Sequence, residues 1–368
     1  MARRIRLGMV GGGEGAFIGG VHRIAARLDG RFELVAGAFS ASADNSVRTA
    51  EALGVRGYGR FADMAAAEAA RPDGIEAVSV VTPNATHFAV ASAFLDAGFD
   101  VICDKPVTTT LRDAKALAEK VATSGRVFVL THNYSGTPMV RQMRAMVAGG
   151  AIGAVRYAET RYLQDWMARK IEDSGLKQAV WRSDPKQSGP VGALGDIGTH
   201  AHHLLRFVTG AEWAVESAAL HTLVPGRVLD DTATVMLSSG AARAVLTCSQ
   251  VAVGHENDLV LAIYGETGGL TWRQEEPNTL IHAPLGEPPR RLTRAGHGIA
   301  PEVAAIGRIP AGHPEGYLEA FATIYSEAAD LIEARREGTA LPDRLVPGIN
   351  DGVAGMAFIE DVLRIAGR

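Results

Sequence analysis

The 368-residue chain is 47% apolar and 21% charged, so it can bury a large core, and its length predicts two domains. Its formal net charge is −4 and its basic residues are scattered, which argues against the single-sign surface that nucleic acid or an anionic membrane requires. Its two cysteines, Cys103 and Cys248, lie far apart and form no CxxC pattern, so neither a disulfide framework nor a thiolate metal site is expected.

The N-terminal segment MARRIRLGMV has the basic start of a signal peptide, but glycine at Gly11 cuts its apolar run short. No stretch of the chain approaches the roughly 18 uninterrupted apolar residues of a membrane-spanning helix. We therefore expect a cytoplasmic protein without a membrane partner.

Residues 1–133 are expected to form the first domain. Short Val, Ile and Leu runs alternate there with Ala-rich amphipathic segments, which is typical of a parallel sheet covered by helices. The predicted strands are residues 5–10, 32–39, 76–81, 100–104 and 126–131. The predicted helices are residues 46–54, 86–98 and 111–125, and each ends on a glycine suited to a helix C-terminus. This order predicts a doubly wound parallel α/β sheet of the Rossmann type.

The first strand runs into six glycines within ten residues, in MVGGGEGAFIGGVHR, and a helix is expected to begin near Ile18. Glycine permits a tight turn and lets the backbone approach a pyrophosphate, which a helix N-terminus attracts. The dinucleotide fingerprint is matched irregularly, with Gly11 and Gly13 in place and Ala16 in the position of the third glycine. The pattern predicts a dinucleotide site, and a flexible glycine turn is the alternative.

The end of the second strand bears on the choice between NAD and NADP. NAD-binding sheets usually end this strand on an acid that holds the ribose hydroxyls. Here the strand ends GAFSAS, where Ser40 and Ser42 can bond a ribose, and no acid follows. No arginine lies nearer than Arg48 to neutralise a 2′-phosphate. We favour NAD and keep NADP as the alternative.

The segment VVTPNATH ends the strand at 76–81 and opens a helix, with Thr86 as a candidate N-cap. It supplies four further residues at the strand end: Thr82, Pro83, Asn84 and His87. Because strand ends at this edge line the ligand crevice, we expect these four to contact ribose and nicotinamide. The alternative is that these residues only form an ordinary turn between a strand and a helix.

The next strand ends on Asp104, Lys105 and Pro106, in VICDKPVTTT. A buried strand should carry no unpaired ammonium, because removing a charge from water is costly. Lys105 is therefore expected to lie where the strand opens onto solvent or ligand.

Residues 134–368 are expected to form a second, α+β domain with a large open sheet. A helix at 138–150 precedes a strand, a polar loop and another helix. The runs 214–224, 231–239, 242–253, 259–266 and 269–274 look like an antiparallel meander. The segment Pro284–Gly312 is expected to be a long loop, and two helices close the chain. The free face of such a sheet is expected to form a homo-oligomer, as a dimer or tetramer.

The strongest chemical pattern of this domain is GDIGTHAHH. A helix beginning near Ile197 would place Asp196 and His200 on one face at i, i+4 spacing, as a general-base pair. Asp196 as an N-cap is the alternative, and the two roles are compatible. A metal site of Asp196, His200 and His203 is weighed and not favoured, because no sulfur or HExxH spacing supports it.

The preceding loop is rich in aromatic and hydrogen-bonding side chains: Tyr162, Gln164, Trp166, Trp181, Arg182, Asp184 and Lys186. Aromatic faces beside fixed polar groups suit a polyhydroxylated ring. A surface loop anchored by its tryptophans is the alternative.

The segments GMVGGGEGAFIGGVHR, TPNATH, DKP and GDIGTH occur in an order that resembles the glucose–fructose oxidoreductase, inositol dehydrogenase and MocA family over nearly the whole chain. The resemblance implies a Rossmann domain, a C-terminal domain whose open sheet often makes oligomer contacts, and NAD(P)-dependent redox chemistry on sugars and cyclic polyols. It matches the family lysine to Lys105 and the family Asp-x-x-x-His pair to Asp196 and His200. Three features depart from the family pattern: Asp104 stands where a glutamate is usual, the glycine loop is longer, and His203 replaces an aspartate. They put the substrate in doubt.

We therefore expect an NAD(P)-dependent dehydrogenase or reductase of a ring hydroxyl or ketone in a sugar, pyranoside or cyclic polyol. The expected catalytic residues are Lys105, Asp196 and His200, with no metal. The expected cofactor contacts are Gly11, Gly13, Ala16, Phe17, Ile18, Ser40, Thr82, Pro83, Asn84, His87, Asp104, Lys105 and Asn133. The expected substrate contacts are Lys105, Tyr134, Gln164, Trp166, Trp181, Asp196 and His200. Two alternatives are an enzyme that cleaves glycosides through transient oxidation and a regulator that binds NAD(P) without turnover.

Overall fold

A computed structural model describes residues 3–368, which divide into two compact units. The first unit contains residues up to Asn133 together with Phe321–Met356, and the second contains Tyr134–Ala320 and Ala357–Arg368. Residues 321–356 stand in the second domain of the sequence-based division, whereas their contacts are with the first unit. The boundary therefore falls inside the last two long helices.

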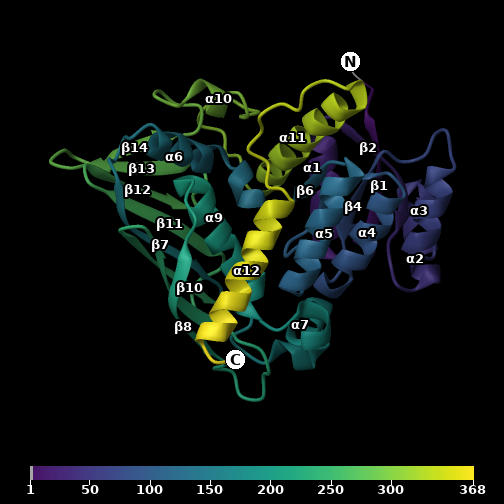
Figure 1. Cartoon of the computed structure of the whole chain (residues 1–368), viewed down its shortest axis with the longest axis horizontal. Helices are drawn as coiled ribbons and strands as arrows, with labels where there is room; N and C mark the ends of the chain where they lie inside the picture. Colours follow the sequence, from purple (N-terminus) through teal and green to yellow (C-terminus); the bar gives the residue numbers. More distant parts are fainter. Residues whose placement is uncertain (1–2) are drawn as a thin grey trace. The chain divides into compact units, whose positions relative to one another are not determined.

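The first unit is built on a six-stranded parallel sheet in the order β3-β2-β1-β4-β5-β6 (Figure 1). Its strands are β1 (Ile5–Gly11), β2 (Phe32–Ala38), β3 (Arg56–Gly57), β4 (Ala77–Val81), β5 (Asp100–Cys103) and β6 (Phe128–Leu130). Strand order reverses between β1 and β4, which makes the carboxyl ends of these strands the ligand edge of a doubly wound sheet. The predicted Rossmann sheet is confirmed.

The helices of this unit are α1 (Phe17–Leu28), α2 (Ala43–Leu53), α3 (Phe61–Ala69), α4 (His87–Asp96) and α5 (Leu111–Ser124), with α11 (Tyr317–Glu337) and α12 (Ile349–Ile365) shared with the second unit. Glycines in the left-handed conformation end α2 at Gly54 and α5 at Gly125. A short 3-10 turn, η1 (Asn84–Thr86), precedes α4. Thr86 caps α4 by position only, because its hydroxyl donates to the carbonyl of Pro83.

The second unit is built on an eight-stranded sheet in the order β14-β13-β12-β11-β7-β10-β9-β8. Its strands are β7 (Val155–Leu163), β8 (Ala214–His221), β9 (Thr232–Ser239), β10 (Ala242–Ser249), β11 (Asp258–Gly265), β12 (Gly268–Arg273), β13 (Thr279–Pro284) and β14 (Arg290–Thr293). The pairing is antiparallel except between β7 and β10. The open, mainly antiparallel sheet is confirmed.

Two expectations for this sheet need correction. The meander was expected to run through consecutive strands, but β7 lies between β11 and β10 and pairs parallel with β10. The segment Pro284–Gly312 was expected to be a loop, but it contains β14 and the short helix α10 (Pro301–Ala304). The expected neighbours β8–β9, β9–β10 and β11–β12 do pair, whereas the insertion of β7 and the two additional strands β13 and β14 were missed.

One face of this sheet is covered by α6 (Pro138–Ala148) and α9 (Thr199–Thr209), and Figure 1 shows α9 beside β7, β10 and β11. The shorter helical segments are η2 (Asn133–Gly136), η3 (Ile171–Ser174), α7 (Lys177–Ser183), α8 (Pro185–Ser188) and η4 (Leu194–Gly198). Along β9, Ala233, Val235 and Leu237 are fully buried whereas Met236 is 47% exposed. This alternation leaves the second face open, and the homo-oligomer expected there stays a prediction.

Candidate active site

The glycine turn between β1 and α1 brings two backbone segments into direct contact. Gly11 and Gly12 have left-handed φ angles of +82° and +71°. A Cβ atom at Gly11 would lie 2.7 Å from the carbonyl oxygen of Val81, and one at Gly19 would lie 2.3 Å from the Cα atom of Gly12. Only glycine fits at these contacts, and the resulting thin turn at a helix N-terminus suits a pyrophosphate.

Gly19 takes the packing role that the dinucleotide fingerprint gives to its third glycine, and sequence reasoning missed it. Ala16, placed in that position from the sequence, instead precedes α1 and donates its N–H to the carbonyl of Gly13 over 3.0 Å. Phe17 and Ile18, also expected at the cofactor, are the first two residues of α1. The adjacent glycines Gly19 and Gly20 are the feature of the sequence that could have indicated this close contact.

Ser40 and Ser42 follow β2, where the ribose was expected. The hydroxyl of Ser42 caps α2 by accepting from the N–H of Asn45, and the hydroxyl of Ser40 accepts from the N–H of Ser42 over 3.2 Å. Both serines help to form the turn after β2. The chain places no acid between Phe39 and Ser42.

The imidazole of His87 joins the ends of β4 and β5. Its Nδ1 lies 2.8 Å from the carbonyl oxygen of Pro106, and its Nε2 lies 2.8 Å from that of Thr82. Burial lowers the pKa of His87, an effect opposed by Asp104 and by the two carbonyls. Because both ring nitrogens face the protein, His87 positions the two strand ends rather than offering a free polar atom to a cofactor.

Asp104 and Lys105 lie at the end of β5, where the Lys105–Pro106 peptide bond is cis. The carboxylate of Asp104 accepts from the N–H of Lys105 and from the hydroxyl of Thr131, each over 2.9 Å. The carboxylate therefore joins the ends of β5 and β6. Lys105 itself is half-buried.

Two expected cofactor contacts hold polar atoms that the described chain does not satisfy. The Thr82 hydroxyl oxygen and the Asn133 side-chain nitrogen are buried without a hydrogen-bond partner among residues 3–368. Such groups are costly to bury, which makes Thr82 and Asn133 candidates for hydrogen bonds to a bound cofactor. Pro83 and Asn84 occupy the turn that follows Thr82.

In the second unit, Asp196 lies inside a single π-turn, η4, that continues directly into α9. The backbone is already helical at Ala193. A helix beginning near Ile197 was expected, with Asp196 as a possible N-cap, and the structure corrects this because Asp196 is within the helical run. π-Turns inside helices are frequent at functional sites.

The carboxylate of Asp196 is held by two side chains from other elements. Its Oδ2 accepts from Nε of Arg182 over 3.0 Å and from Nε2 of Gln250 over 2.9 Å. The Arg182 guanidinium also lies 4.3 Å from the ring of Trp181 and 6.0 Å from that of Trp166. Each indole expected to stack on substrate therefore has this cation over one of its faces.

His200 is 9% exposed and lies against two tyrosine rings. Its ring centroid is 5.0 Å from that of Tyr134 and 6.2 Å from that of Tyr162. The two tyrosine hydroxyls are 2.6 Å apart, and burial raises the pKa of both phenols, so both are neutral. This aromatic wall fixes the plane of the imidazole.

A chain of hydrogen bonds leads from these tyrosines to the loop after β7. Tyr162 donates to Oδ1 of Asn257 over 2.6 Å, and Gln164 donates to the same oxygen over 2.8 Å. Oε1 of Gln164 accepts from Trp166 over 3.0 Å and from Gln250 over 3.5 Å. The network joins Gln164, Trp166 and Asp196, all expected at the substrate, through Gln250 and Asn257, which sequence reasoning missed.

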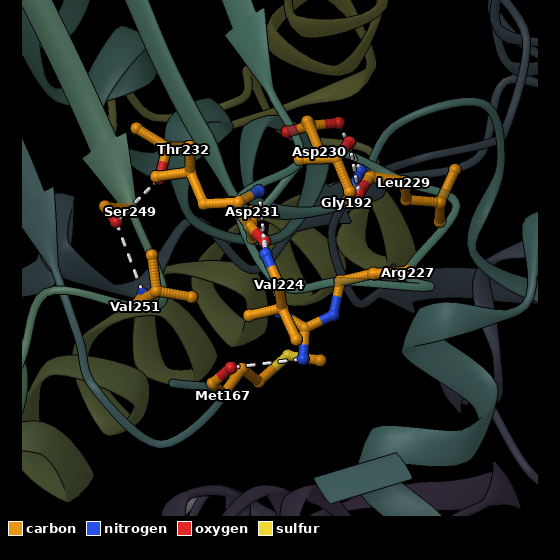
Figure 2. A network of polar contacts seen from close by, with 12 residues as sticks. Met167, Gly192, Val224, Arg227, Leu229, Asp230, Asp231, Thr232, Ser249 and Val251 are labelled. Carbon is orange, nitrogen blue, oxygen red and sulfur yellow. Dashed lines mark hydrogen bonds and ion pairs between the residues drawn. The ribbon is translucent and has the colours of Figure 1, made fainter. Parts of the chain in front are cut away.

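Buried charges fix the backbone just before Asp196, and Figure 2 shows one of them, Asp230, beside Gly192. The carboxylate of Asp230 accepts from the N–H of Gly192 over 2.7 Å and from that of Leu194 over 2.8 Å. Burial raises the pKa of Asp230, and these two amides oppose the shift. Since Leu194 begins η4, Asp230 determines where the π-turn starts.

Arg227, in the same network, holds the segment that precedes α7, the helix that carries Arg182. It pairs with Asp231 over 3.3 Å and with Glu172 over 3.0 Å. It also donates to the carbonyl of Met167 over 3.1 Å (Figure 2). Its side chain is only 2% exposed. The loop is thus anchored to the start of β9.

The histidines after His200 have packing partners. His202 stacks on Phe358 with a centroid distance of 4.1 Å, and burial lowers its pKa. His203 stacks on Phe207 at 5.9 Å. Within residues 3–368, no cluster of three or more His, Cys, Asp or Glu side chains is arranged to hold a metal ion.

Residues 5–132 match the profile of an oxidoreductase family with an NAD-binding Rossmann fold, and residues 140–271 match the GFO/IDH/MocA C-terminal domain. The chain belongs to the GFO/IDH/MocA family. It is an NAD(P)-dependent oxidoreductase of the class that acts on CH–OH groups, and its first unit is the NAD-binding domain.

An oxidoreductase from Sinorhizobium meliloti is 48% identical, with a TM-score of 0.90 and coverage of 100% of this chain and 98% of that one. An inositol dehydrogenase homologue from Azotobacter vinelandii, solved with NADH and myo-inositol, is 34% identical, with a TM-score of 0.91 and coverage of 100% and 97%. Levoglucosan dehydrogenase from Pseudarthrobacter phenanthrenivorans is 28% identical over 80% of this chain and 79% of its own.

Every helix in residues 3–368 is too short or too polar to span a bilayer.

Proposed function

We propose that the protein is a dehydrogenase that oxidises a ring hydroxyl of a sugar, pyranoside or cyclic polyol, with NAD as the preferred cofactor. When bound, NAD accepts a hydride at nicotinamide C4. The single observation that carries the proposal is the arrangement in the second unit, where Asp196 is fixed by Arg182 and Gln250 and His200 is fixed by two tyrosine rings.

His200 acts as the general base in this proposal and takes the proton of the reacting hydroxyl. An ordinary imidazole titrates near pH 6.5, so it accepts and returns a proton at neutral pH. In this proposal Asp196, four residues earlier on the same helical run, orients the ring. Its carboxylate stays in one position because two side chains donate to the same oxygen.

Lys105 acts on the substrate oxygen in this proposal. Its ammonium donates a hydrogen bond to the hydroxyl and stabilises the negative charge that develops as the proton leaves. The pairing of Asp104 with the N–H of Lys105 and with Thr131 keeps the backbone at the strand end in place. Reduction of the ketone uses the same groups in reverse order.

The substrate class is supported by the polar network around Asp196 and by two relatives. Gln164, Asn257 and Gln250 form a fixed set of amides beside two neutral phenols, which suits recognition of several hydroxyls. One relative was solved with myo-inositol and another is a levoglucosan dehydrogenase. Both compounds are ring polyols.

The test is a panel of inositols, aldoses and pyranosides offered with NAD or NADP, with reduced cofactor and carbonyl product measured together. The proposal predicts one mole of reduced cofactor per mole of ketone or lactone. Sugar release without net reduced cofactor would favour the glycoside-cleaving alternative. Cofactor binding without turnover on any ring polyol would favour the regulator.

A further inference from the structure

One peptide unit at the centre of the glycine turn is held at both ends. The carbonyl of Gly12 accepts a hydrogen bond from Nη1 of Arg23 over 2.6 Å. The N–H of the same peptide, on Gly13, donates to the carbonyl of Phe39 over 3.1 Å. Both ends therefore have strong partners, one of them a cation.

This peptide needs such restraint because it joins two glycines. Without Cβ atoms, glycine rotates between left- and right-handed conformations at little cost, and Gly12 already has φ +71°. Rotation of the peptide plane would turn the Gly12 carbonyl toward the side where a phosphate binds. A carbonyl dipole there repels the anion that the N–H groups of a helix N-terminus attract.

Arg23 is placed for this contact by the geometry of α1. It follows Gly19 by four residues, so the two lie on the same face of the helix. Gly19 lets that face approach Gly12, and helical side chains point back toward the N-terminus, which directs Arg23 to the turn. Its guanidinium also lies 3.8 Å from the sulfur of Met9.

Withdrawing the Arg23 cation from water costs free energy unless another group compensates the charge. Burial lowers the pKa of Arg23, which shows that its cation is partly withdrawn from water. Arg27, one turn later on α1, is exposed and keeps its charge in solvent. A half-buried guanidinium is compensated by a charge-assisted bond, and here the acceptor is a backbone carbonyl of the turn.

We propose that Arg23 is a positioning residue for the dinucleotide. It holds the Gly12 carbonyl toward α1, so that the turn presents N–H groups to the pyrophosphate. Arg23 acts through the peptide and does not itself contact the phosphates. The inference concerns binding of the cofactor, and it stands whether or not His200 is the general base.

The test compares Arg23→Met with Arg27→Met as the matched control on the same helix. Equilibrium dissociation constants are measured for NADH by fluorescence and for ADP-ribose by calorimetry. ADP-ribose carries the pyrophosphate without the nicotinamide. Arg23→Met should weaken both ligands by about tenfold, because one charge-assisted bond preorganises the turn. Arg27→Met should stay within about twofold of the parent.

Three outcomes would overturn the proposal. The first is an Arg23→Met protein that binds both ligands like the parent. The second is weaker NADH with unchanged ADP-ribose, since that places the defect at the nicotinamide. The third is a shallower salt dependence of NADH binding in Arg23→Met, which would show direct contact of the cation with phosphate. If Arg23→Met does not fold, Arg23→Gln, whose side chain is too short for the same reach, carries the same prediction.

Discussion

At the scale of single residues, the expected cofactor contacts differ in how their polar atoms are already used. Both nitrogens of His87 face backbone carbonyls, and Asp104 is bonded to Lys105 and Thr131. Thr82 and Asn133 hold buried polar atoms without partners among the described residues. We expect cofactor bonds at Thr82 and Asn133, and a supporting role for His87.

The spacing of Asp196 and His200 indicated them as a candidate pair, but it gave no sign of the side chains that contact each of them. Arg182 is 14 residues from Asp196, Gln250 is 54 residues from it, and Asn257 is 95 residues from Tyr162. A sequence pattern reports neighbours along one helix or strand. Contacts of this separation depend on how the sheet is assembled, which periodicity does not encode.

Replacement of Arg182 by methionine tests its role in holding Asp196. The variant keeps an unbranched apolar side chain and removes the charge-assisted bond to the carboxylate, so we expect kcat to fall by about tenfold. The dissociation constant for NADH should not change. Arg169→Met, an exposed position in the same loop, is the control. An Arg182→Met enzyme with the parent kcat would show that Asp196 needs no such support.

At the scale of elements, the π-turn η4 is the feature that sequence reasoning missed most clearly. The letters GDIGTH fit an α-helix that begins near Ile197. The structure starts the helical run earlier because Asp230 accepts from the N–H groups of Gly192 and Leu194. The turn also packs closely, since a Cβ atom at Gly198 would lie 3.1 Å from the sulfur of Cys248.

Helix α11 is tied to the Rossmann sheet by a buried polar cluster. The hydroxyl of Tyr325 lies 2.8 Å from Nδ1 of His22 in α1 and 2.6 Å from the hydroxyl of Ser79 in β4. Two closing helices were expected from the sequence, but nothing in it indicated which sheet α11 would cover. The cluster explains why the part of α11 that begins at Phe321 belongs to the first unit.

This cluster predicts a pH dependence of stability. Burial lowers the pKa of His22 to about 4, whereas an unfolded histidine titrates near 6.5. Between about pH 4 and pH 6.5 the unfolded chain binds a proton at His22 that the folded chain does not. Acidification through this range therefore lowers the free energy of unfolding, whereas stability changes little above about pH 6.5. We expect the free energy of unfolding to fall by about 2 kcal/mol from pH 7 to pH 5 through His22.

The measurement is urea unfolding of the parent and His22→Gln at both pH values. The variant should lose less stability on acidification than the parent does. An equal loss in both proteins would assign the effect to other groups, such as His87 or His202, whose pKa values are also lowered by burial.

At the scale of the whole molecule, the composition of each half predicted its sheet type, because alternating strands and helices differ from a run of strands. The order of the second sheet was not predictable in this way. β7 is separated from β8 by a long loop and several helical segments, yet it pairs in parallel with β10. At β7, strands that are neighbours in the sequence do not pair with each other. At the edge next to β12, the sheet is extended by β13 and β14.

His200 takes the substrate proton in the proposed reaction, and this role is tested by the single-turnover rate of His200→Ala at saturating NAD. Loss of a positioned base predicts a rate about 10² to 10⁴ lower, with the NADH dissociation constant unchanged. His221→Ala, at the exposed end of β8, is the control and should keep the parent rate. If His200→Ala turns over at the parent rate, His200 is not the general base.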